Sequence, residues 1–245
     1  EDRAGRRLTF AERRFVSMAD PHVAGIECTL TAENATLSLH VHSGIDGRVI
    51  NDGAKLYRKF NKKHLQSVER GRIGADAIGL LVRTSQSRLY MAQAARTRLY
   101  VDGRPVEPEL RLLEEDEYIA QEFDVELKPG EPLVVEKLVA LHSSRDRAIS
   151  EPWIASCKTL ARCGRFDAML ARHALAWKHL WGRFDVHLVP ANGWFELNMP
   201  MLLRLNILHL LQCVSPNSIG LDIGVPARAW TGEHYEGHIF WANVV

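Results

Sequence analysis

The stretch Thr36-Leu-Ser-Leu-His-Val-His42 alternates apolar and polar residues with a period of two. That period is typical of a β-strand with one buried face and one solvated face. Similar short apolar or alternating runs recur around it, and Asp102-Gly103 and Pro129-Gly130 lie between runs as turns. The runs cover residues 25–30, 77–82, 98–101, 117–125 and 133–141. This spacing predicts an antiparallel β-sandwich over residues 1–147.

The basic stretch at residues 56–74 interrupts these runs and is predicted to be a long loop. After Arg147 the pattern becomes helical. A first helix is expected with Ser150 as its cap, Pro152 in its first turn and Gly164 after its end. A second helix is expected from Asp167 to Gly182. Its apolar stripe consists of Leu170, Ala174, Trp177 and Trp181. These helices form a predicted linker over residues 148–184, with the tryptophans as core residues.

A third helix, at residues 196–214, is apolar on most of its circumference. Its few polar residues do not leave a wide solvated face, and a helix of this kind requires neighbours on several sides. The remaining residues are loop-like and too few to cover it. We therefore expect residues 185–245 to be the truncated start of a further domain. On this hypothesis the chain is a fragment, or another chain completes it.

Composition excludes several classes of protein. The 245 residues carry a formal net charge of +1, which does not indicate a nucleic-acid partner. The four cysteines lack Cys-x-x-Cys spacing and are expected to be reduced. No apolar run follows the basic N-terminus, and residues 199–211 are too short and too polar to span a bilayer. A cytoplasmic protein without a membrane partner is expected.

Two histidine pairs are candidate metal ligands. His40 and His42 lie on one face of a predicted strand, but no third ligand is near them in the sequence. They are predicted to be two exposed histidines. The spacing of His234 and His238 resembles a zinc helix, but Gly237 interrupts the helix and no downstream ligand follows. No metal site is therefore predicted.

The C-terminal stretch from Val225 to Trp241 mixes aromatic rings, histidines, glutamates and an arginine. Rings stack on the apolar faces of sugars, and charged groups hydrogen-bond sugar hydroxyls. Glu233 and Glu236 form a carboxylate pair of the kind used in glycoside chemistry. From the residues alone, Glu233 is a candidate general acid, or it holds the loop by pairing with Arg228.

Several motifs resemble glycoside hydrolase family 65, which contains maltose, trehalose, kojibiose and nigerose phosphorylases and some α-glucoside hydrolases. The most specific motif is Gly232-Glu-x-Tyr-x-Gly-His-x-Phe-Trp241. Before it come Arg204-x-x-x-x-His209-Leu-Leu-Gln212 and Gly224-Val-Pro-Ala-Arg228. Further upstream the similar segments are Arg14-Phe-x-Ser-Met-x-Asp-Pro-His22, Ser43-Gly-Ile-Asp-Gly-Arg-Val-Ile-Asn51, Glu136-Lys137 and Ser144-Arg-Asp146. The resemblance extends along nearly the whole chain in the same order.

The resemblance implies a mainly β fold with α elements. An N-terminal β-sandwich, linker helices and the beginning of an (α/α)6 barrel would be present here. It also implies inverting phosphorolysis or hydrolysis of α-linked glucose disaccharides, without a cofactor and with inorganic phosphate as co-substrate of a phosphorylase. The family's general acid has no counterpart in this chain, so the resemblance removes Glu233 from that role and leaves no catalytic residue.

The substrate-binding residues implied by the motif are Arg228, Glu233, Tyr235, His238, Phe240 and Trp241, with Trp241 facing the glucosyl unit. One departure is Ala242, where the family usually has an aspartate. We expect the chain to be inactive alone, with a homodimer or the missing C-terminal barrel as its protein partner. The alternative is a non-catalytic carbohydrate-binding or scaffolding β-sandwich protein.

Overall fold

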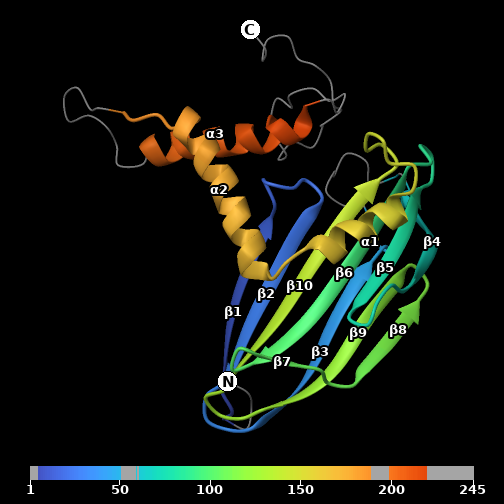
Figure 1. Ribbon diagram of the computed structural model, residues 1–245, viewed down its shortest axis with the longest axis vertical. Coiled ribbons are helices and arrows are strands. Elements are labelled where there is room, and N and C mark those ends of the chain that lie inside the picture. The colour runs from blue at the N-terminus through green and yellow to red at the C-terminus, as the bar shows by residue number, and fades with distance from the viewer. Residues whose placement is uncertain (1–4, 51–58, 60, 189–198, 220–245) are drawn as a thin grey trace. The chain divides into compact units, whose positions relative to one another are not determined.

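The computed structural model describes residues 5–50, 59, 61–188 and 199–219. These residues form two β-sheets and three α-helices (Figure 1). The strands are β1 (Leu8–Val16), β2 (Val23–Ala32), β3 (Leu37–Asp46), β4 (Leu65–Arg72), β5 (Ala77–Thr84), β6 (Tyr90–Val101), β7 (Arg104–Val106), β8 (Leu110–Glu115), β9 (Tyr118–Leu127) and β10 (Pro132–Ser143). The helices are α1 (Pro152–Arg162), α2 (Phe166–Phe184) and α3 (Met199–Cys213), followed by the 3-10 helix η2 (Pro216–Ser218).

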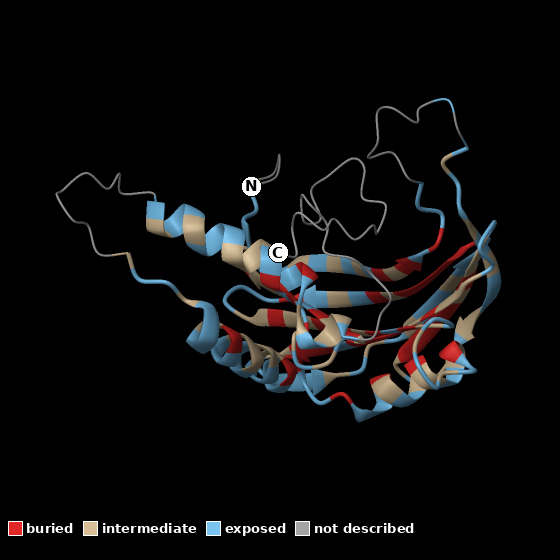
Figure 2. Ribbon diagram, turned by 90° about the horizontal axis from the view of Figure 1, so that it is seen from above, coloured by how far each residue is buried: buried red, intermediate tan, exposed pale blue. Residues whose placement is uncertain are grey.

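Both sheets are antiparallel throughout, which confirms the predicted fold class. The large sheet has the strand order β1-β2-β10-β6-β5-β4, and β7 pairs with β6. The small sheet has the order β3-β9-β8. Side chains between the sheets form apolar clusters around Leu99, Phe123 and Leu133 at one end, and around Leu80 and Ile119 at the other. Figure 2 shows buried residues along these strands.

The other face of the large sheet is covered by α1 and the first turns of α2. Leu138 on β10 belongs to the same buried cluster as Leu160 of α1 and Phe166 of α2. Helix α1 lies so close to β5 that a Cβ on Gly79 would come within 2.5 Å of the Trp153 ring. The glycine therefore permits this close approach. The strand β5 is therefore buried on both faces, and its sequence Ala-Ile-Gly-Leu-Leu-Val lacks the alternation of a half-exposed strand.

Both predicted turns are present. Asp102 and Gly103 join β6 to β7, and both have positive φ, 51° and 74°. Positive φ at both central residues is typical of a two-residue type I′ hairpin, whose twist matches that of the flanking strands. Gly130, between β9 and β10, has φ 82°. Glycine adopts this left-handed conformation without the steric cost that a Cβ brings.

The predicted loop at residues 56–74 was wrong over part of its length, because β4 lies within it. Strand β4 is at the edge of the large sheet and carries polar or charged residues on both faces, which hides the alternation. Its register shifts between Ser67 and Glu69, which breaks the period further. The edge strands β1 and β8 were also absent from the predicted runs.

The helix ends differ from the predicted ends in two places. The residue at the N-cap of α1 is Glu151 rather than Ser150, and no side chain caps this helix. Pro152 does occupy the first turn, where a missing N–H costs nothing. Gly182 lies inside α2, which continues to Phe184. In the predicted stripe Ala174 is exposed, while Trp177 and Trp181 are half-buried and stack with ring centroids 6.4 Å apart.

The chain divides into two compact units, residues 1–51 with 60–173 and residues 52–59 with 174–245. In the second unit, α3 is apolar on most of its circumference, as predicted. Five large apolar side chains are exposed: Met199, Met201, Leu202, Leu205 and Leu210, with Met201 61% and Leu210 52% exposed. Arg204 forms two 2.9 Å hydrogen bonds to the carboxylate of Asp185. No helix among the described residues combines the length and apolarity needed to cross a membrane.

Candidate functional site

The sugar-facing wall predicted from the C-terminal motif lies outside the described residues. This applies to all six of its members: Arg228, Glu233, Tyr235, His238, Phe240 and Trp241. Their roles stay predictions. The described residues instead contain three polar assemblies that could carry function. These are a charged row on the large sheet, a stacked histidine pair, and a histidine–carboxylate group on the small sheet.

The charged row crosses the helix-covered face of the large sheet. Arg13, Glu27, Glu136 and Arg98 are direct cross-strand partners on β1, β2, β10 and β6. Two carboxylates opposite each other are unfavourable unless each has its own cation. Arg13 donates to Glu27 at 2.9 Å through Nε. Glu136, only 2% exposed, accepts from Arg165 Nε at 3.2 Å. Each carboxylate of the row therefore has its own cation, Arg13 for Glu27 and Arg165, in the turn before α2, for Glu136.

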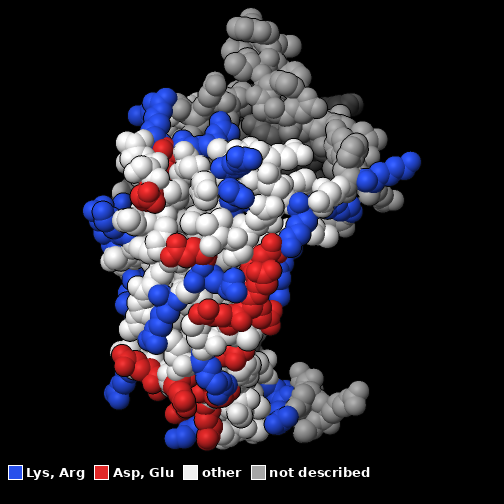
Figure 3. All heavy atoms as spheres, turned by 90° about the vertical axis from the view of Figure 1, so that its right-hand side faces the viewer, with Lys and Arg blue, Asp and Glu red and all other residues white. Residues whose placement is uncertain are grey.

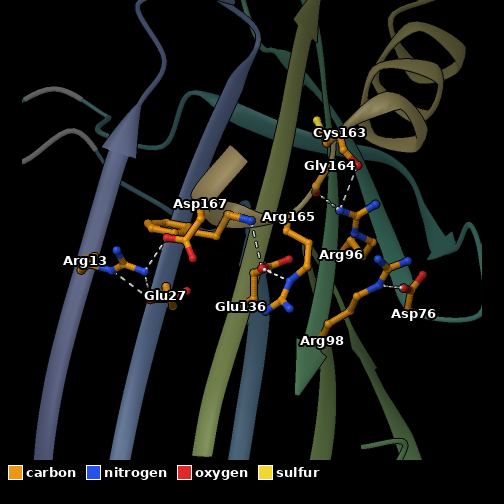
Figure 4. A network of polar contacts seen from close by, with 11 residues as sticks. Arg13, Glu27, Asp76, Arg96, Arg98, Glu136, Cys163, Gly164, Arg165 and Asp167 are labelled. Atoms are coloured by element: carbon orange, nitrogen blue, oxygen red, sulfur yellow. Dashed lines mark hydrogen bonds and ion pairs between the residues drawn. The ribbon is translucent and has the colours of Figure 1, made fainter. Parts of the chain in front are cut away.

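The row also holds the turn between α1 and α2 (Figure 4). Arg96 donates to the carbonyls of Cys163 at 3.2 Å and Gly164 at 2.7 Å, just past the last turn of α1. Glu136 accepts from the backbone N–H of Phe166, the first residue of α2, at 2.9 Å. A cation at a helix C-terminus and an anion at a helix N-terminus both suit the helix dipoles. The sandwich thus determines where α1 ends and α2 begins.

A cleft of about 880 Å³ lies beside this row, and its lining includes Asp76, Arg98, Tyr100 and Arg165. Its cations already have partners. Arg98 bonds Asp76 at 2.6 Å, and Arg165 bonds Glu136. The Tyr100 ring is 5% exposed and is covered by the Arg165 guanidinium at 3.6 Å. The cleft therefore offers neither a free charge nor an open aromatic platform from these four side chains.

The histidine pair consists of the buried His142 and the partly exposed His22, and it brings together two segments that carried the family resemblance, one with His22 and one with Asp146. His22 and His142 stack with ring centroids 3.8 Å apart, beside Asp146. His22 Nδ1 lies 2.9 Å from the Leu141 carbonyl, so it must hold its proton and donate it. His142 Nε2 bonds the hydroxyl of Thr159 at 2.9 Å. With His22 Nδ1 protonated, the atom facing Asp146 cannot ligate a metal, and the pair is structural.

Burial lowers the pKa of His142, and neighbouring His22 lowers it further, against the opposing effect of Asp146 and Asp20. Burial also lowers the pKa of His173. In the unfolded chain a histidine titrates near ~6.5, so the unfolded state binds more protons below that pH. The lowered pKa values of His142 and His173 therefore make the free energy of unfolding fall as pH decreases from about 6.5 to about 5, and the raised pKa of His40, which hydrogen-bonds Asp124, opposes this fall. The pKa values of Asp46 and Asp124 are lowered, and protonation of these carboxylates reduces the free energy of unfolding only at still lower pH.

This pH dependence can be checked by urea unfolding of the protein and of His142→Gln across that range. The variant should lose less stability on acidification, since it lacks one of the two histidines whose pKa is lowered. His173 should account for the pH dependence that remains. His64→Gln, at an exposed position, is the control and should keep the parental slope. Equal slopes for His142→Gln and the parent would contradict the assignment.

The third assembly lies around His40 and His42. They lie on the outer face of β3, as predicted, and the antiparallel register places Glu122 and Asp124 of β9 opposite them. The sequence does not identify either carboxylate as a partner of the histidines, because about 80 residues separate them. The only sequence indication is that β9 also alternates, with Glu122 and Asp124 on one face.

The surface shows no broad field of one charge on the face drawn in Figure 3, where Lys and Arg side chains lie beside Asp and Glu side chains. Many of the described exposed charges are paired, as in the contact of Arg48 with Asp46 at 2.9 Å.

Comparison with known proteins gives consistent results. Residues 1–180 match the model of the glycosyl hydrolase family 65 N-terminal domain. An uncharacterized glycosyl hydrolase of Mycobacterium tuberculosis is 35% identical over 240 residues, covering 98% of this chain and 18% of that protein. A kojibiose phosphorylase of Halothermothrix orenii is 25% identical over 247 residues, covering 97% of this chain and 30% of the relative.

A provisionally named kojibiose phosphorylase from the human microbiome has a solved structure with the same fold. It superposes with a TM-score of 0.73 at 15% identity, over 98% of this chain and 29% of its own. The chain thus spans less than a third of the length of each of these relatives. Because the family model covers well over half of the sequence, the chain belongs to glycosyl hydrolase family 65 and contains that family's N-terminal domain.

Proposed function

We propose that the chain is the N-terminal part of an enzyme that acts on α-glucosidic disaccharides by inverting phosphorolysis or hydrolysis. The observation that carries this proposal is α3, whose apolar side chains are exposed on several sides. Such a surface suits a helix that packs against others, as the first helix of an (α/α)6 barrel would. This chain aligns with less than a third of the length of these relatives, and the rest of their length is sufficient for such a barrel.

In this proposal the sandwich and the α1–α2 linker position the entrance to the barrel. Trp241 and Phe240 contribute one wall of the sugar site, and Arg228, Glu233, Tyr235 and His238 shape it. The charged row is the structural support, because it determines where α2 begins. No cofactor is required, and inorganic phosphate is the co-substrate if the enzyme is a phosphorylase. A cytoplasmic location fits this chemistry and stays part of the proposal.

We expect the purified 245-residue chain to show no turnover, since the family's general acid has no counterpart in it. The measurement is release of glucose or glucose 1-phosphate from maltose, trehalose and kojibiose, with and without phosphate. A longer protein that adds the barrel is the positive control, and Trp241→Ala in it should lower activity. Turnover by the 245-residue chain alone would refute the proposal.

The alternative of a carbohydrate-binding sandwich is less favoured by the structure. The cleft beside the charged row has the Tyr100 ring covered by Arg165, so sugar stacking there would first require displacement of a paired guanidinium. Calorimetric titration with the same disaccharides separates the two readings. Binding by the 245-residue chain that survives Trp241→Ala would favour the alternative.

A further inference from the structure

The outer face of the small sheet brings together two imidazoles and a carboxylate. His42 on β3 is the direct cross-strand partner of Glu122 on β9, and His40 is the partner of Asp124. His42 Nδ1 lies 3.1 Å from Glu122 Oε1, and His40 Nε2 lies 3.6 Å from the same oxygen. One ligand atom from each of the three residues lies within 4.8 Å of the other two. We infer that His40, His42 and Glu122 form a binding site for one divalent transition-metal ion, with Zn²⁺ the ion that suits the donors best.

The spacing of these atoms fits a small tetrahedral ion. Zinc bonds of about 2.0–2.1 Å at tetrahedral angles place neighbouring ligand atoms roughly 3.3–3.4 Å apart. The two histidine-to-carboxylate distances, 3.1 and 3.6 Å, lie on either side of that value. Two histidines and one glutamate are an established zinc donor set, with water as the fourth ligand.

The far nitrogen of each ring is already engaged, which leaves the near nitrogen for the ion. His40 Nδ1 lies 2.8 Å from Asp124 Oδ1, so the proton belongs on Nδ1 and the lone pair on Nε2. His42 Nε2 contacts the Tyr118 hydroxyl, and His42 Nδ1 hydrogen-bonds Glu122 Oε1 at 3.1 Å. A bound ion would replace that hydrogen bond, with the ring proton on Nε2 and donated to the Tyr118 oxygen. A carboxylate behind a ligating histidine is the usual second layer of a protein zinc site, because it orients the ring and raises its basicity.

Arg111 on β8 bonds the other oxygen of Asp124 and lies near the other oxygen of Glu122. Its Nη2 lies 2.5 Å from Asp124 Oδ2, and its Nε lies 4.0 Å from Glu122 Oε2. The oxygens that face the histidines, Oδ1 and Oε1, are thereby left in place for them. Gly44 permits the contact between Tyr118 and His42, because a Cβ on residue 44 would overlap the Tyr118 hydroxyl.

Strand β3 is at the edge of the small sheet, so a bound ion would link this edge strand to the central strand β9. The ion would bind the folded chain and not the separated strands, and it should therefore stabilise the fold. Binding must also displace protons from imidazole nitrogens, so the affinity should fall as the pH is lowered.

The test is calorimetric titration of the chelator-treated 245-residue chain with Zn²⁺, together with thermal unfolding. We expect one ion per chain and a midpoint that rises with Zn²⁺. His42→Gln or Glu122→Gln should weaken binding by more than about 100-fold, and Asp124→Asn, in the second layer, by about 10–100-fold. These positions are at the surface, and equal midpoints without metal would show that the variants fold.

Two control variants address the other histidine pairs. His22→Gln alters the His22–His142 pair, and His238→Gln alters the pair of His234 and His238. Both should retain the parental affinity and stoichiometry. Cobalt(II) provides a second readout, since four-coordinate Co²⁺ absorbs strongly in the visible region and His42→Gln should abolish that band. Absence of stoichiometric Zn²⁺ binding, or loss of binding in a control while His42→Gln retains it, would overturn the inference.

Discussion

Phe166→Ala should destabilise the protein by about 3–5 kcal/mol, the cost typical of removing a fully buried phenylalanine. Phe166 begins α2, is 0% exposed and heads the largest fully buried side chains of the described residues. Its ring meets Phe15 edge to face with centroids 5.2 Å apart, and the Arg13 guanidinium lies 5.1 Å from its centroid. The substitution therefore removes both the buried area and the ring contact of α2 with Phe15 on β1.

Phe184→Ala is the matched control, because it makes the same chemical change at the other end of the same helix. Phe184 is 49% exposed, and we expect a loss below about 1 kcal/mol. Urea unfolding followed by far-ultraviolet circular dichroism measures both. Similar losses for the two variants would show that the start of α2 does not pack as the structure describes.

Glu136→Ala should cost about 2–4 kcal/mol, which is the second large effect. The buried carboxylate accepts from the Phe166 N–H and from Arg165, and both donors lose their acceptor when it is removed. Arg165 is half exposed and can turn to water, so the cost should remain below that of a fully buried pair. The Phe166 N–H is buried and cannot bond water in place of the lost carboxylate.

Glu136→Gln separates the hydrogen bond from the charge. Its side-chain oxygen can still accept from the Phe166 N–H, and the loss of charge removes the repulsion from Glu27 directly opposite. We expect a loss about half that of the alanine variant, measured by the same unfolding experiment. Glu126→Ala, at an exposed site on β9, should change stability by less than about 0.5 kcal/mol. A Glu136→Ala variant as stable as Glu126→Ala would contradict this role.

Prediction from sequence succeeded where the decisive information was local. Period-two alternation identified β3, and turn residues identified the Asp102-Gly103 hairpin. Pro152 marked the first turn of α1. Prediction failed at β4, an edge strand with polar residues on both faces, and at the end of α2, where Gly182 did not terminate the helix. Favourable hydrogen bonding along α2 outweighed the modest cost of a glycine.

The candidate site could be predicted only in part, and for a related reason. The motif from Gly232 to Trp241 named the sugar-facing residues, which lie outside the described residues. His40 and His42 were identified as a pair on one face, and the structure confirms their placement. Glu122 could not be added to them from sequence, because strand pairing is set by packing and register over the whole sheet.

The sequence by itself thus determined the local elements: the alternating strands, the turns, the helix after Pro152 and the apolar circumference of α3. Only the tertiary structure decided which distant residues meet. Glu136 reaches the N–H of Phe166 across 30 positions, and His42 faces Glu122 across 80. Local conformation follows from each residue's own torsional and solvation preferences. Partners of this kind depend on the antiparallel register, where a shift of one residue would turn every side chain to the opposite face.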